Sequence, residues 1–116
     1  MATGTIVQNF PISGSNTKGN YIKFPDGTLI QFGNVLGISY SSQDLKEGTA
    51  DLPIAFYDTN YKVFGSCYTS STNNLVLRVG LYPNTASNFS WSLATNTATT
   101  VSNRGFNWMA IGRWKA

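Results

Sequence analysis

The sequence contains few side chains that could make or break a covalent bond. It has no histidine, which removes the commonest general base, the usual Ser or Cys triads and most transition-metal sites. Glycoside hydrolysis needs two facing carboxylates, and five acidic residues are available for it. Asp26 belongs to a predicted turn, and Asp44 and Glu47 flank a lysine in a polar stretch. A pair formed by Asp51 and Asp58 therefore remains as a route to a glycan-cleaving enzyme.

Reversible glycan binding needs other groups, which this sequence places near its predicted turns. A sugar is held by a flat aromatic face together with amides or hydroxyls, and an arginine can bind an acidic substituent. The candidate binding residues are Tyr40, Tyr57, Tyr82, Asn84, Asn88 and Arg104, the last of which lies in the final predicted turn. Each also has a structural explanation, because Asn favours turns and Tyr packs at strand ends. Trp91, Trp108 and Trp114 are expected in the core or in subunit contacts.

Charge is sparse and scattered along the chain. Charged residues make up 11% of the sequence, and eight basic and five acidic side chains give a net charge of +3. No Lys/Arg cluster stands out, so no nucleic-acid partner is expected. The basic end Arg113-Trp114-Lys115 is interpreted as a short exposed terminus rather than as a phosphate contact, because the two charges of Arg113 and Lys115 neutralise few phosphates.

The length of 116 residues fits one domain. Cys67 is the single cysteine, so stability must come from packing or assembly rather than from an intramolecular disulfide. No apolar stretch approaches the roughly 20 residues that span a bilayer, and Met1-Ala2-Thr3-Gly4 opens no signal peptide. We expect no membrane insertion and no cofactor.

Short apolar segments separated by turn clusters predict an all-β fold. Pro25-Asp26-Gly27 lies between two such segments, where Pro fixes φ for a turn and Gly takes the left-handed position, which predicts a hairpin. The predicted strands are residues 21–24, 28–32, 35–40, 49–52, 61–69, 75–82, 89–95 and 106–114. Helical periodicity is nearly absent, apart from a weak pattern around residues 42–47. This spacing favours an antiparallel sandwich or barrel.

The two faces of the predicted strands differ. In residues 75–82 the odd positions are apolar, whereas Arg78 and Tyr82 lie on the opposite face. The last strand has Phe106, Trp108 and Trp114 on one side and Met109 and Ile111 on the other. A small sandwich has one interior, so an outer apolar face predicts contact with another subunit. The alternative is a covering loop of the same chain.

Three segments carry a pattern in a fixed order. Residues 19–33, GNYIKFPDGTLIQFG, look like a G-Y-I-K-x-P-x-G-x-I-I-Q-W-G opening, with Phe32 in place of the expected Trp. Residues 52–56 and 61–64 are similar to an F-P-I-x-F…P-x-V middle, and residues 106–115, FNWMAIGRWK, to an F-x-W-x-A-I-G-x-W ending. Together, from about Gly19 to Lys115, they resemble the C-terminal domains of phage and prophage tail fibres.

The resemblance implies an antiparallel β-sandwich similar to invertebrate agglutinins of the H-type, assembled as a homotrimer. Residues 1–19 would then be a lead-in from the fibre shaft and residues 20–116 the receptor-binding tip. The implied partners are the other chains of the trimer, the rest of the fibre, and a bacterial surface glycan such as lipopolysaccharide, or an outer-membrane receptor. The implied location is the distal end of a virion fibre, assembled in the host cytoplasm.

The sequence therefore predicts a non-enzymatic tip adhesin. Two alternatives stay open: a structural domain that trimerises and caps the fibre without a receptor site of its own, and a glycan depolymerase.

Overall fold

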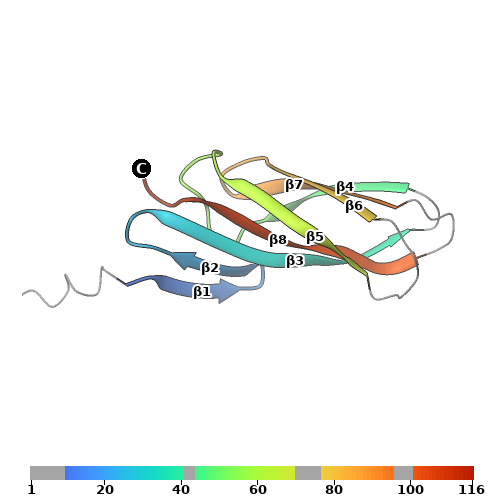
Figure 1. The fold of residues 1–116 in the computed structure, drawn as a ribbon, viewed down its shortest axis with the longest axis horizontal. Helices are drawn as coiled ribbons and strands as arrows, with labels where there is room; N and C mark the ends of the chain where they lie inside the picture. The colour runs from blue at the N-terminus through green and yellow to red at the C-terminus, as the bar shows by residue number, and fades with distance from the viewer. Residues whose placement is uncertain (1–9, 41–43, 70–76, 96–100) are drawn as a thin grey trace, which may run out of the picture.

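The computed structural model describes residues 10–40, 44–69, 77–95 and 101–116. Within these ranges the chain is all-β, and no helix in them is long and apolar enough to cross a membrane. The strands are β1 (Ile12–Asn16), β2 (Gly19–Lys23), β3 (Thr28–Tyr40), β4 (Asp44–Asp51), β5 (Lys62–Thr69), β6 (Leu77–Pro83), β7 (Asn88–Thr95) and β8 (Val101–Arg113) (Figure 1).

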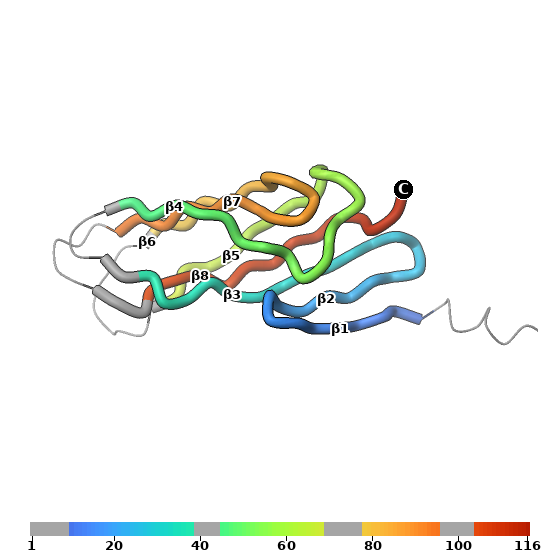
Figure 2. The backbone as a smooth tube through the Cα atoms, turned by 180° about the vertical axis from the view of Figure 1, so that it is seen from behind, coloured from blue at the N-terminus to red at the C-terminus, as the bar shows by residue number. Residues whose placement is uncertain are grey.

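The strands form two antiparallel sheets packed against each other, which confirms the predicted all-β antiparallel fold. The larger sheet has the order β1-β2-β3-β8-β5 and the smaller sheet the order β4-β7-β6. Strand β5 at the edge of the larger sheet contacts β6 of the smaller one. Seen from the other side, β4 and β7 run along one layer and β3 and β8 along the next (Figure 2).

The β2–β3 hairpin has the predicted turn. Gly27 has a φ of 102°, a conformation that a residue with a Cβ rarely adopts. The Asp26 carboxylate accepts a hydrogen bond from the Thr28 backbone N–H at 2.8 Å. This bond is the main reason that the pKa of Asp26 lies below its usual value, and the charges of Arg113 and Lys115 add to it. Asp26 therefore has a structural role.

The core lies between the two sheets and is rich in aromatic rings. Phe89 and Phe106 are fully buried, and Trp108 is 3% exposed. The Phe89 and Trp108 rings lie 5.1 Å apart, and Trp91 lies 5.6 Å from Phe106, in the tilted arrangements that aromatic pairs prefer. These contacts join β7 of the smaller sheet to β8 of the larger one, and so hold the two layers together.

A buried amide fixes the segment that follows β4. Gln31 is fully buried in β3, and its side chain donates a hydrogen bond to the Ile54 carbonyl at 3.0 Å and accepts one from the Ile54 N–H at 2.9 Å. Two backbone groups in an irregular segment are thereby paired, as burial requires. Leu52 and Phe56, on either side, join the core.

Strand boundaries differ from the sequence predictions in several places, and β8 begins at Val101 rather than at Phe106. The weak helical pattern around residues 42–47 is wrong from residue 44 on, because Asp44–Asp51 pairs along its whole length with β7, and residues 42 and 43 lie outside the described residues. The two segments expected at residues 28–32 and 35–40 form the single strand β3, which has register shifts on either side of Ile38. Strand β1 was not expected, because Ile12–Asn16 has no apolar alternation and is held by pairing with β2.

Strand β1 falls within the expected lead-in segment. Residues 12–16 form the edge of the larger sheet, next to β2. The domain boundary at residue 19 stays a prediction, since part of the segment before it pairs with the sheet.

Strand β8 has the two-sided apolar character expected from the sequence. Phe106, Trp108 and Ala110 are buried between the sheets, whereas Met109 and Ile111 point outward and are 40% and 39% exposed. The predicted faces of residues 75–82 are also confirmed where the side chains are described, since Val79 and Leu81 pack against the core and Arg78 and Tyr82 are exposed.

Candidate functional site

The six predicted binding residues divide between the two ends of the molecule. Tyr82, Asn84 and Asn88 lie together at the β6–β7 turn, and Tyr57 lies in the β4–β5 connection at the same end, where its backbone N–H donates to the Arg113 carbonyl at 2.7 Å. Tyr40 and Arg104 belong to the opposite end, where β3 pairs with the start of β8. The side chain of Tyr40 lies outside the described residues.

The sequence predicts Arg104 in a turn, but the structure places it in a strand. It lies within β8, and its side chain is 3% exposed because it points between the sheets, like Phe106 two residues later. An arginine in this position does not reach a ligand at the surface of the chain. We therefore leave Arg104 out of the site considered below.

The β6–β7 turn is rigid because its polar groups bind one another. The Asn84 side-chain amide donates to the Asn88 side-chain oxygen at 2.8 Å, and the backbone N–H of Thr85 donates to the Asn88 carbonyl at 3.0 Å. The Tyr61 hydroxyl, whose pKa burial raises, lies 2.7 Å from the same carbonyl. Tyr61 is itself fixed by stacking on Phe56, with ring centres 4.3 Å apart. The amides of the exposed Asn84 and the half-buried Asn88 are thus held in place before any ligand arrives.

Tyr82 opens a polar face that continues across the smaller sheet. Its cross-strand partner is Ser90, and the partner of Ser90 on the next strand is Thr49, so the three side chains share the outer face. Glu47 and Ser92 form the neighbouring row with Gly80. The tyrosine is 61% exposed. A hollow of about 390 Å³ lies over this face, lined by Glu47, Gly48, Thr49, Tyr82, Ser90, Trp91 and Ser92.

A glycine on β6 leaves part of this face open. A Cβ at Gly80 would come within 2.8 Å of the Ser92 hydroxyl oxygen. The missing side chain leaves the Ser92 hydroxyl open in the row next to Tyr82. The result is an aromatic ring next to several hydrogen-bonding groups, the combination that a sugar requires.

The sequence predicts Tyr82, Asn84 and Asn88 as binding residues, but this prediction does not include the rest of this face. Glu47, Thr49, Ser90 and Ser92 come from strands far apart in the chain, and only the pairing of β4 with β7 and of β7 with β6 brings them together. For Ser90 and Ser92 the sequence did contain a signal. They alternate with apolar residues along β7, and this alternation places both serines on the outer face.

Asp51 and Asp58, the two acidic residues that the sequence left as a possible glycosidase pair, each have another partner in the structure. Asp51 lies 3.8 Å from the Lys18 ammonium group, and Asp58 accepts hydrogen bonds from the backbone and side chain of Asn60. Glu47 is the acidic residue that lines the hollow. Among the described residues no cluster of carboxylates or cysteine could hold a metal ion.

The larger sheet has an outer face of the opposite character. Phe32 and Phe64 are the cross-strand partners of Met109, and Ile30 is the partner of Ile111. We call this set, together with Ile22 beside Ile30, the outer apolar patch. Phe64 is 53% exposed and Phe32 is 37% exposed. Such a row of large apolar side chains is typical of a surface that contacts another protein.

Most of the chain matches the model of a known protein family. Residues 23–113 match the family described as "Putative tail fiber protein gp53-like, C-terminal". No curated protein sequence matches the chain.

Two solved structures share the fold at 16% sequence identity. One is the Pseudomonas aeruginosa R1 pyocin fibre comprising C-terminal residues 323–701, with a TM-score of 0.69 over 89% of this chain and 28% of that one. The other is an N-truncated R1-type pyocin tail fibre, with a TM-score of 0.70 over 97% of this chain and 96% of that one. The chain thus spans 28% of the length of the longer pyocin fibre.

Proposed function

Because the chain belongs to the family of gp53-like tail fibre C-terminal domains, we propose that it is the receptor-binding tip of such a fibre and recognises a bacterial surface glycan. Its relatives lie in the tails of phage or pyocin particles, so the chain has a role in a tail fibre. The finer parts of the proposal are the distal position, the trimer and the sugar. Each rests on a feature of the surface.

The observation that carries the glycan proposal is the exposed Tyr82 ring beside the hydroxyls of Thr49 and Ser90. The ring offers a flat face for sugar C–H groups, and the hydroxyls and the carboxylate of Glu47 can bind sugar hydroxyls. Asn84 and Asn88 extend the site toward the turn with amides that are already immobilised, so little side-chain entropy is lost on binding. The mechanism is reversible recognition in which no covalent bond is broken.

The homotrimer is supported by the outer apolar patch on β2, β3, β5 and β8. Its exposed side chains would be desolvated if the same face of each chain packed around a common axis, as closed assemblies require. A trimer presents three copies of the Tyr82 face on one rigid tip. Multivalency then raises the overall affinity well above that of one site without any new contact.

Binding of the purified trimer to a panel of bacterial strains and to their isolated polysaccharides tests the proposal. We expect binding to at least one strain, competed by the polysaccharide of that strain. A verified trimer that binds neither cells nor polysaccharide would contradict the adhesin proposal.

The outer apolar patch also supports a second candidate, a structural domain that trimerises and caps the fibre while another protein recognises the host. Competition separates the two functions. An adhesin tip, added in excess, blocks attachment of the particle that carries it. A purely structural tip leaves attachment unchanged, although it still assembles as a trimer.

A further inference from the structure

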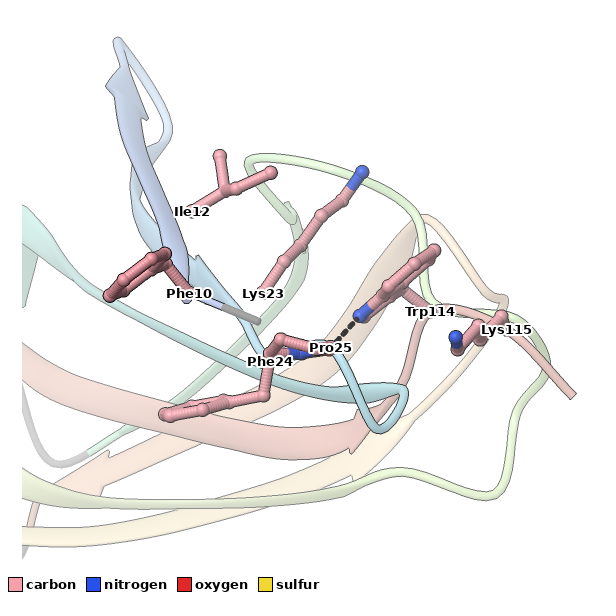
Figure 3. Close-up of a pocket in the computed structure, with 7 residues that line it drawn as sticks. All are labelled: Phe10, Ile12, Lys23, Phe24, Pro25, Trp114 and Lys115. Atoms are coloured by element: carbon pink, nitrogen blue, oxygen red, sulfur yellow. Dashed lines mark hydrogen bonds between the residues drawn. The ribbon is translucent and has the colours of Figure 1, made fainter. Parts of the chain in front are cut away.

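A second hollow lies at the end of the molecule where the C-terminal segment meets the β2–β3 hairpin. It has a volume of about 370 Å³, within the range of small-ligand sites. Trp114, Phe24, Pro25 and Ile12 supply its apolar walls, and Lys23 and Lys115 supply two ammonium groups (Figure 3). This surface is separate from the Tyr82 hollow, which has no lining residue in common with it.

The Trp114 ring is held rigidly. Its indole N–H donates to the Phe24 carbonyl at 2.8 Å, as the dashed line in Figure 3 shows, and its backbone N–H donates to the Gly27 carbonyl at 2.9 Å. Arg113, just before it, donates from its guanidinium to the Asp26 carbonyl at 2.8 Å and to the Lys115 carbonyl at 3.2 Å. The ring therefore forms a fixed wall, which lowers the entropic cost of binding against it.

Positive charge gathers around this wall. The Lys23 ammonium lies 5.1 Å and the Lys115 ammonium 4.9 Å from the centre of the Trp114 ring. In the part of the chain that the structure describes, the acidic side chain near these groups is Asp26, which is bound to Thr28, and neither lysine forms an ion pair with it. Arg113 and Lys115 both act on the Asp26 carboxylate, and Lys23 adds a third positive charge beside the ring. The hollow thus has an excess of positive charge.

We propose that this hollow binds an acidic sugar, one that carries a carboxylate or a phosphate, as a second subsite for the surface glycan; the inference rests on the proposed function. The anionic substituent forms charge-assisted hydrogen bonds with the ammonium groups of Lys23 and Lys115, which line the hollow. The sugar ring packs against Trp114 and Pro25, and the charge of the two lysines selects an acidic sugar over a neutral one.

Sequence alone had favoured a plain exposed terminus for Arg113-Trp114-Lys115. The fold changes this interpretation, because it places Lys23, some ninety residues earlier, over the same ring. It also fixes Trp114 at the edge of the core, where the half-buried ring lines the hollow. Two ammonium groups and an aromatic wall around one hollow form a site that the C-terminal residues could not form by themselves.

The test uses the three tryptophans as reporters. Protein labelled with ¹⁵N-tryptophan is titrated with glucuronic acid, glucose 6-phosphate, glucose and inorganic phosphate while the indole N–H signals are followed. We expect the Trp114 signal to shift saturably with both acidic sugars and not with glucose, while the Trp91 and Trp108 signals stay in place. Added salt should weaken the effect, because exposed charges are screened.

The double variant Lys23→Gln/Lys115→Gln should bind the acidic sugars at least about fivefold more weakly, since two charge-assisted contacts are lost. Lys18→Gln/Arg78→Gln removes the same charge elsewhere and should bind like the wild type. Unchanged Trp91 and Trp108 signals show that each variant is folded. Equal shifts with glucose, equal affinity for inorganic phosphate and glucose 6-phosphate, or no loss in the first variant would overturn the proposal.

Binding to bacteria distinguishes this inference from the proposed function. If the wild type and Lys23→Gln/Lys115→Gln bind cells equally well, the acidic subsite is wrong and the adhesin proposal stands. If the wild type binds no strain or polysaccharide, the adhesin proposal itself fails. A Trp114 signal that no probe shifts, because a neighbouring chain covers the ring in the assembled protein, also overturns the subsite.

Discussion

The two sheets of this domain have outer faces that suit different partners. The face of the larger sheet has Phe32, Phe64, Met109 and Ile111 in adjacent cross-strand rows, whereas the face of the smaller sheet has Thr49, Ser90 and other hydroxyls beside Tyr82. The first face resembles half of a protein contact, and the second an open sugar-binding surface. Each sheet thus packs one face against the shared core, and the other faces of the two sheets differ in the kind of partner that they suit.

The difference shows that exposed area alone does not identify a binding site. Phe64 and Tyr82 are exposed to a similar extent, 53% and 61%. Their neighbours decide what they can bind, since Phe64 adjoins Met109 and Tyr82 adjoins Ser90. An apolar neighbour favours a desolvated contact, and a hydroxyl favours a ligand with its own hydrogen-bonding groups.

The largest effect is expected from a charge on the apolar face. Met109→Asp would bury a carboxylate in the proposed trimer contact, at a cost of several kcal/mol, and should convert the proposed trimer to monomer. Light scattering measures the mass directly. Arg78→Asp, on the outer face of the smaller sheet, should leave the mass unchanged. A Met109→Asp protein that stays trimeric would remove the assigned role of this face.

A substitution in the core between the two sheets should lower the stability of the whole domain. Leu93 is fully buried between the sheets, and Leu93→Ala should lower the free energy of unfolding by about 2–5 kcal/mol because it leaves a cavity. Leu45, 51% exposed, serves as the control, and Leu45→Ala should change stability by less than about 0.5 kcal/mol. Urea unfolding at one fixed protein concentration provides the measurement, since assembly contributes to stability. Equal losses in the two variants would contradict the assigned core.

A milder effect is expected on the polar face. Tyr82→Ala should weaken glycan binding about tenfold, the loss of one aromatic contact of roughly 1.4 kcal/mol, without changing the mass of the assembly. Tyr82→Phe keeps the ring and should retain most of the affinity. Titration calorimetry with a polysaccharide that the wild type binds measures both. Full affinity in Tyr82→Ala would move the receptor site elsewhere.

The smallest expected effect is a change in the reactivity of Cys67, on the inner side of β5. Cys67 packs against Leu93, and burial raises the pKa of its thiol above the usual value. Because the thiolate is the reactive form, Cys67 should react with iodoacetamide more slowly than free cysteine at pH 8, and the rate should rise with pH. Arg78→Cys in a Cys67→Ser background places a thiol on the outer face and should react faster. Equal rates would show that the sheets open readily.

Much of the fold follows from local patterns in the sequence. The Pro25-Asp26-Gly27 turn was predictable because only Gly takes its φ of 102° without strain. The inward positions of β6 were predictable because alternate residues of a strand point to opposite faces. The two-sided apolar character of β8 was visible for the same reason. By contrast, β1 and β4 have weak alternation of their own, and they are strands because a neighbour supplies hydrogen bonds to them.

The sites depend on the tertiary structure. Sequence determined that the chain is an all-β domain without histidine, and that tyrosines and asparagines gather near its turns. It did not determine that Arg104 is buried, that Thr49 lies beside Ser90, or that Lys23 reaches Trp114. Local patterns fix which face of a strand a residue occupies, because that depends on the residue itself. Which strands become neighbours depends on contacts across the whole chain, and these contacts decide which side chains meet.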